Sequence, residues 1–210
     1  MTDFAGDFEV HVTVQPPDPA ALERFRAWCQ QHKCKCIRIV LARGDHVEQP
    51  MATWRRGVTT LPAVLAHARD RIGELERASI PVVRLKIEAA PDNDGVPQND
   101  TAEQDAANYF EHHVKLLRDP TAGREELLQT CLKFGAHVSR NAWRENLQGL
   151  EERFVTARHY RVGRATAEQR LQRLLAALTE LGEKVIEVES EYVVFDSNVQ
   201  LDAGWLPQVE

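Results

Sequence analysis

The chain has 210 residues, of which 43% are hydrophobic and 28% are charged, as in an ordinary globular protein. Its net charge of −6 argues against general nucleic-acid binding, because phosphate backbones bind basic surfaces. No stretch approaches the roughly 20 apolar residues of a membrane span, and the first residues lack a secretory signal. We therefore expect a cytoplasmic protein with no membrane partner and with four reduced cysteines.

The first half of the chain reads as strand, helix, strand, strand, helix and strand. Apolar and polar side chains alternate from Phe8 to Val14, as in a half-buried strand. Asp18 followed by Pro19 marks the start of a helix that runs to about Gln31. The elements expected after it are strands at 34–41, 51–56 and 82–89 and a helix at 61–78.

The second half repeats this order of elements. A polar, turn-rich linker at 94–107 separates the halves. The elements expected after it are strands at 109–117, 136–142, 153–162 and 184–195 and helices at 123–134 and 166–181. These boundaries predict one module at 1–93, a second at 108–198 and a C-terminal tail at 199–210, which contains Asp-Ala-Gly-Trp and which we expect to cover the first module.

The residues themselves recur with nearly constant spacing. Phe-Glu-Val-His-Val at 8–12 returns as Phe-Glu-His-His-Val at 110–114, a displacement of 102 residues. A displacement of 102 or 103 residues relates further pairs: Arg38 and Arg140, Thr53 and Thr156, Arg55 and Arg158, Glu88 and Glu191. The fold class predicted from this pattern is α+β, a tandem duplication of a ferredoxin-like β-α-β-β-α-β module with antiparallel sheets.

Strand parity indicates which side chains face away from the helices. In the first strand of each half these include His11 and His113. The first and last strands of such a module are neighbours, so we expect His11 near Lys86 or Glu88, and His113 near its counterparts Glu189 or Glu191. A face so rich in ionisable groups predicts either a solvated surface or a polar cleft between the modules.

His11-Val12-Thr13-Val14 resembles the His-x-Thr/Ser-x element of the 2H phosphoesterases, which are two-lobed phosphodiesterases. The resemblance implies a hydrolase in which two histidines act as general base and general acid. At the symmetric position His113 is followed by Lys115, where a hydroxyl is expected. His137 and Ser139 match the tetrapeptide better, but on another strand.

A second resemblance is to metal-dependent enzymes of the vicinal oxygen chelate type, whose duplicated modules present a His from a first strand and a Glu from a last strand. The residues similar to that set are His11, Glu88, His113 and Glu191. Imidazole and carboxylate ligands suit divalent transition metals, so such an ion is the alternative cofactor. Those modules have one helix fewer than the ones expected here.

The leading hypothesis is that the cleft binds, and in its fuller form hydrolyses, a small phosphorylated or otherwise anionic ligand without a cofactor. Its catalytic residues are His11, His113, Thr13 and Lys115, and its ligand-binding residues are Arg140, Arg38, His137 and Ser139. The competing hypothesis is a non-catalytic ligand- or protein-binding module. The four repeated arginines predict either an anion clamp or pairing with Glu9 and Glu111.

Overall fold

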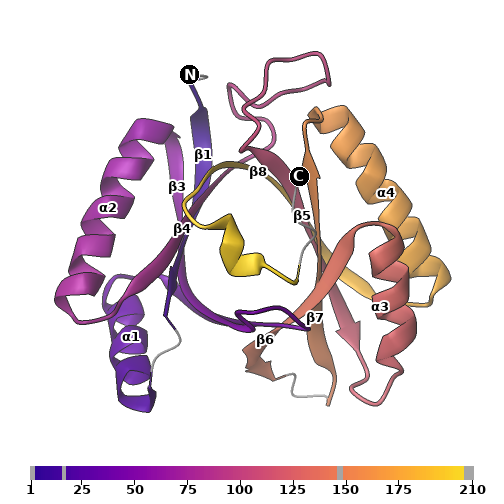
Figure 1. The fold of residues 1–210 in the computed structure, drawn as a ribbon, viewed down its shortest axis with the longest axis horizontal. Coiled ribbons are helices and arrows are strands. Elements are labelled where there is room, and N and C mark those ends of the chain that lie inside the picture. Colours follow the sequence, from indigo (N-terminus) through magenta and orange to yellow (C-terminus); the bar gives the residue numbers. More distant parts are fainter. Residues whose placement is uncertain (1–2, 16–17, 146–148, 206–210) are drawn as a thin grey trace.

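The computed structural model describes residues 3–15, 18–145 and 149–205 and shows an α+β fold in which every paired strand is antiparallel (Figure 1). The first half contains β1 (Ala5–Val14), α1 (Pro19–Gln31), β2 (Lys35–Leu41), β3 (Glu48–Thr60), α2 (Leu61–Arg77) and β4 (Val82–Ala89). The second contains β5 (Tyr109–Arg118), α3 (Arg124–Lys133), β6 (Ala136–Glu145), β7 (Glu151–Tyr160), α4 (Arg164–Glu180) and β8 (Val185–Asp196). The predicted order of elements is confirmed in both halves.

Local chemistry explains where these elements begin. The side chain of Asp18 accepts a hydrogen bond from the backbone N–H of Ala21 at 2.7 Å, and Pro19 occupies the first turn of α1. In β1 the alternate residues Phe8, Val10 and Val12 are buried, as the sequence pattern predicts. β3 is longer than expected because it pairs along its length with both β1 and β2.

The strands close into one eight-stranded barrel in the order β1-β3-β2-β6-β7-β5-β8-β4. Within each half the order is ferredoxin-like, with β1 between β3 and β4 and β5 between β7 and β8. The halves meet edge to edge, through β2 with β6 and through β4 with β8. We expected two open sheets that face each other across a cleft, and the structure corrects this: the two sheets are a single closed one.

The helices lie outside the barrel, α1 and α2 against the first half and α3 and α4 against the second (Figure 1). Two apolar clusters fill the space between helices and strands, one built around Phe25, Leu75 and Ile87 and the other around Leu127, Leu174 and Val155. Because these clusters take the outward side chains of the strands, the opposite side chains point into the barrel.

The C-terminal segment forms the short helix η1 (Val199–Asp202), which lies in one opening of the barrel (Figure 1). Trp205 packs against Leu41 and donates a hydrogen bond from Nε1 to the carbonyl of Val138, so the segment contacts both halves and not the first alone. The rest of the predicted tail, 206–210, lies outside the described residues. No helix among the described residues is long and apolar enough to span a membrane.

Candidate functional site

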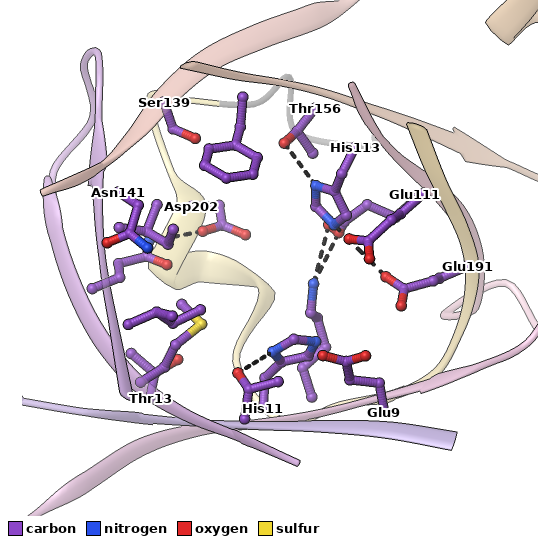
Figure 2. A pocket seen from close by; sticks show the side chains of 18 of the residues that line it. Glu9, His11, Thr13, Glu111, His113, Ser139, Asn141, Thr156, Glu191 and Asp202 are labelled. Atoms are coloured by element: carbon purple, nitrogen blue, oxygen red, sulfur yellow. Dashed lines mark hydrogen bonds and ion pairs between the residues drawn. The ribbon is translucent and has the colours of Figure 1, made fainter. Parts of the chain in front are cut away.

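The barrel encloses a cavity of about 250 Å³ with two unlike walls (Figure 2). Strands β1, β4, β5 and β8 line one wall with ionisable side chains. The other wall contains the apolar side chains that the strands contribute to the lining, which are Ile37, Ile39, Leu41, Met51 and Phe154, and they lie among polar ones from the same strands. The lining side chains Glu187 and Glu189 are 53% and 44% exposed, so they mark the mouth of the cavity.

His11 is held at both nitrogens of its ring. Nε2 donates to Oε2 of Glu88 at 2.5 Å, and Nδ1 lies 2.9 Å from Oγ1 of Thr53. These partners come from β4 and β3, the two strands that flank β1. The expectation that His11 lies near Lys86 or Glu88 is confirmed, because Lys86 is its direct partner in the strand pairing.

His113 occupies the equivalent place in the second half but is held more loosely. Its Nδ1 lies 3.0 Å from Oγ1 of Thr156, and its Nε2 is 3.9 Å from Oε2 of Glu191, which is beyond hydrogen-bonding distance. Its predicted proximity to Glu191 is confirmed. Burial lowers the pKa of His113, so this ring is neutral at pH 7 and can take or give a proton.

Glu88 and Glu191 form a carboxyl pair across the seam between the halves, with one oxygen of each within 4.8 Å of the other. Burial and the neighbouring Glu88 raise the pKa of Glu191 well above its usual range. Burial acts on Glu88 in the same direction, but His11 and Lys86 outweigh it and lower the pKa of Glu88. The pKa values of the two carboxyl groups are therefore shifted in opposite directions, so Glu191 holds a proton more readily than Glu88 does.

Two cations neutralise the buried carboxylates beside this pair. Lys86 Nζ lies 2.5 Å from Oε1 of Glu88 and 3.0 Å from Oε2 of Glu111, and Arg158 Nη2 lies 3.1 Å from Oε1 of Glu111. Burial alone would raise the pKa of Glu111, but Arg158 and Lys86 hold it well below its usual range. Glu88 and Glu111 are each 1% exposed, so the solvated-surface interpretation is wrong.

A second group of ion pairs lies under η1. Arg84 binds both oxygens of Asp196, at 2.9 and 2.6 Å, and also Oδ2 of Asp202 at 2.9 Å. Arg158 reaches the same Oδ2 at 2.7 Å, and Nε2 of Gln49 donates to Oδ1 at 2.9 Å. Asp202 is therefore bound on both oxygens although η1 is not part of the barrel wall.

Together these side chains form what we call the interior charge network. Its carboxyl groups are Glu88, Glu111, Glu191, Asp196 and Asp202, and its permanent cations are Arg84, Lys86 and Arg158. The network thus has two more carboxyl groups than cations. The raised pKa of Glu191 lowers the cost of this excess, because a protonated carboxyl group adds no charge to the buried network.

Two overlapping groups of side chains have the spacing of metal ligands. One ligand atom each from His11, Glu88 and Glu191 lie within 4.8 Å of one another, and the same holds for Glu88, Glu111 and His113. The predicted metal set is thus divided between two groups that share Glu88. Imidazole with carboxylates fits zinc, iron, manganese or nickel, but Lys86 already contacts Glu88, so an ion would have to displace the ammonium.

The other predicted site residues are divided between the cavity and the outside. Thr13, Lys115 and Ser139 line the cavity, and Lys115 is paired with Glu187 at 3.2 Å. His137 is buried at one side, beside Arg43.

Arg38 and Arg140 are not in the cavity, which corrects their expected role in binding a ligand there. Arg38 pairs with Glu48 at 2.6 Å, and Arg140 is exposed on the outer face of β6. Their strand neighbours Ile37 and Asn141 point inward instead. For the other two repeated arginines, the expected pairing with glutamates is confirmed: Arg55 binds Glu9 at 2.5 Å, and Arg158 binds Glu111.

Sequence reasoning missed three groups that the structure brings together here: Gln49, Asp196 and Asp202. Gln49 precedes Pro50 and lies outside the strand predicted at 51–56, and Asp202 lies in a tail without any periodic pattern. The one usable signal was Asp196, which directly follows the predicted last strand and is a carboxylate with no neighbouring cation in the sequence.

No family model matches the chain, and no curated protein matches it. Among solved structures, the chain is similar to a candidate glycine cleavage system transcriptional repressor (13% identity, covering 89% of this chain and 96% of that one, TM-score 0.29). It is similar to the regulatory subunit of aspartate kinase from Thermus thermophilus in its ligand-free form (13%, 84% and 97%, 0.33). A third is a candidate monooxygenase from Lactobacillus acidophilus NCFM (11%, 92% and 94%, 0.28).

Proposed function

We propose that the barrel interior binds a small molecule that has both a polar and an apolar part. The observation that carries this proposal is the pair of unlike walls around one cavity. The polar part would meet His11, His113 and Glu191, and the apolar part would lie along β2 and β3. Small-molecule sites commonly combine an apolar lining with a few convergent polar groups, which is the composition found here.

Proton exchange is the chemistry that this site offers to a bound ligand. Burial lowers the pKa of His113, whose Nε2 lies 3.9 Å from Glu191, and burial together with Glu88 raises the pKa of Glu191. A ligand group placed at Nε2 would therefore have an acid and a base within reach. A phosphodiester between the two imidazoles would instead lie beside the ionised Glu88, which repels it, so we do not extend the proposal to hydrolysis.

We also interpret the two halves as a tandem duplication. The support for this interpretation is that in each half a histidine lies between a threonine hydroxyl and a glutamate carboxyl group. These residues are His11, Thr53 and Glu88 in the first half, and His113, Thr156 and Glu191 in the second. Under this interpretation the cavity is a shared site on a pseudo-two-fold axis, to which both halves contribute equivalent residues.

The proposal is tested by screening the full chain against a library of small polar fragments and recording shifts in melting temperature. Ile37→Trp would fill the cavity from its apolar wall and should abolish the shifts that the wild type shows. Ile186→Trp is the matched control, since Ile186 is 43% exposed and does not line the cavity. Fragments that bind Ile37→Trp as well as the wild type, or no binding fragment at all, would contradict the proposal.

A second candidate function is a divalent-metal centre, which the two groups of ligand-spaced side chains favour. A divalent cation would offset the excess of two carboxyl groups over permanent cations in the interior charge network. Calorimetric titration of metal-free protein with Zn²⁺ or Mn²⁺ should then give one ion per chain, with proton release on binding. His11→Ala should abolish the binding, whereas the exposed His46→Ala should leave it unchanged. Absence of stoichiometric binding would remove this candidate.

A further inference from the structure

Asp202 is the one carboxylate of the interior charge network that does not belong to a barrel strand. Glu88 is on β4, Glu111 is on β5, and Glu191 and Asp196 are on β8, so each of these is fixed by sheet hydrogen bonds. Asp202 ends the one-turn helix η1. It can therefore leave the network without breaking the sheet, and none of the other four can.

The segment 199–205 presents two kinds of surface to the cavity. The carboxylate of Asp202 binds Arg84, Arg158 and Gln49, as described above, and is 3% exposed. The apolar side chain of Trp205 packs on Leu41 and Ile39, which belong to the apolar wall. A carboxylate on the arginines and an apolar group on the wall is the arrangement that a small amphipathic carboxylate would adopt.

Charge balance limits how an anion can enter this cavity. The network already has two more carboxyl groups than permanent cations, so an added anion would be repelled. An anion that replaces Asp202 would leave the balance unchanged, because one carboxylate is exchanged for another on the same two guanidinium groups.

We propose that Arg84, Arg158 and Gln49 form a carboxylate subsite, which Asp202 fills until a small carboxylate with an apolar chain displaces the segment 199–205. This inference rests on the proposed function and adds to it the class of ligand and the way in which the cavity opens. The backbone of the segment is tied to the barrel by the bond from the N–H of Asp45 to the carbonyl of Ala203, at 3.1 Å.

The test uses octanoate as the carboxylate and 1-octanol as the uncharged comparison, both added to the wild-type chain. Hydrogen exchange is followed at the amides of Asp45 and Trp205, which donate to Ala203 and Asp202. Octanoate should increase the exchange rates of both amides at least tenfold because it releases the segment, and octanol should leave these rates unchanged. Unchanged exchange at saturating octanoate would overturn the proposal.

A matched pair of variants gives an independent measurement. Asp202→Asn keeps the shape of the side chain but loses the charge that competes for the arginines, so octanoate should bind it about tenfold more tightly. Asp45→Asn removes a carboxylate charge from an exposed residue whose backbone N–H bonds to the same segment, and it should bind octanoate as the wild type does.

Equal octanoate affinity in all three proteins would overturn the carboxylate subsite and leave the proposed function standing, provided that Ile37→Trp still blocks other fragments. If no fragment and no carboxylate binds the cavity, both proposals fall together. If Asp202→Asn does not fold, exchange in the wild-type chain still decides the question.

Discussion

Glu88 and Glu191 stand at equivalent positions 103 residues apart in the chain, yet their pKa values are shifted in opposite directions, that of Glu88 down and that of Glu191 up. The cause is the surroundings of each carboxyl group. Lys86 and His11 contact Glu88 directly, whereas His113 stays 3.9 Å from Glu191. Equivalent positions in the two halves therefore hold carboxyl groups with opposite pKa shifts.

Replacing each glutamate of this pair by glutamine should give unequal results. Glu191→Gln replaces a buried carboxyl group, whose raised pKa shows that its charged form is disfavoured, by a neutral amide, so the free energy of unfolding should change by less than about 1 kcal/mol. Glu88→Gln removes the carboxylate that faces Lys86 and His11, and should lower the free energy of unfolding by about 3–5 kcal/mol. Urea denaturation of both variants at pH 7 checks this, and equal losses would show that Glu191 is ionised.

Stability should fall as the pH is lowered from about 6.5 to about 4, because buried histidines stay neutral in the folded chain. Burial lowers the pKa of His112 and His159 to about 4 each, and their rings are 5.3 Å apart. Between those values the unfolded chain binds protons that the folded chain does not, so each histidine contributes up to about 1.4 kcal/mol per pH unit.

His159→Phe should reduce the dependence of the free energy of unfolding on pH by the contribution of one histidine. Denaturation at several pH values measures this dependence. The exposed His46→Phe is its control and should leave the slope unchanged. An identical pH dependence in wild type and His159→Phe would show that His159 is already charged in the folded protein.

The threonines beside the two catalytic candidates should each set the orientation of one ring. Thr53→Val removes the hydroxyl at Nδ1 of His11 and should cost about 1 kcal/mol of stability, as for a lost hydrogen bond. Thr156→Val should do the same at His113 and, because that ring has no second partner as close, should also shift its tautomer. The nitrogen chemical shifts of the two imidazoles report their tautomers. A larger change in these values at His11 in Thr53→Val than at His113 in Thr156→Val would contradict the prediction.

Two glycines each stand at the N-cap of a helix in the second half, and replacing them by alanine should change stability to different extents. A Cβ on Gly163, at the start of α4, would lie 2.2 Å from the backbone of Asn99 in the linker, whereas one on Gly123, at the start of α3, would meet nothing within 4 Å. Gly163→Ala should therefore lower the free energy of unfolding by about 1–3 kcal/mol, and Gly123→Ala should be close to neutral. Thermal unfolding of the two variants measures the contrast, which would vanish if the linker were not packed there.

Strand parity was enough to predict the charged wall of the cavity. His11, Glu88 and His113 lie on strands whose other face is regularly apolar, so their direction could be read from the sequence. β2 has apolar residues on both faces, and parity could not show that Ile37 points inward and Arg38 outward. The resemblance to 2H phosphoesterases at His11–Val14 stays a prediction.

Barrel closure could not be read from the sequence, because it depends on pairings between distant edges. β2 meets β6 through three residue pairs, and β4 meets β8 across a bulge, and neither pairing leaves a local pattern. The place of Asp202 was hidden for the same reason, since its partners Arg84 and Arg158 are more than 40 residues away in the chain.

Because the barrel closes within one chain, the two halves can also change in sequence independently of each other. If two identical copies paired across the same seams, any substitution would appear twice, and both sides of the cavity would have to change together. Here Thr13 and Lys115 face the same cavity from equivalent strands, one with a small hydroxyl and the other with an ammonium group. A single polypeptide can therefore adjust one side of its interior to a ligand while the opposite side keeps its composition.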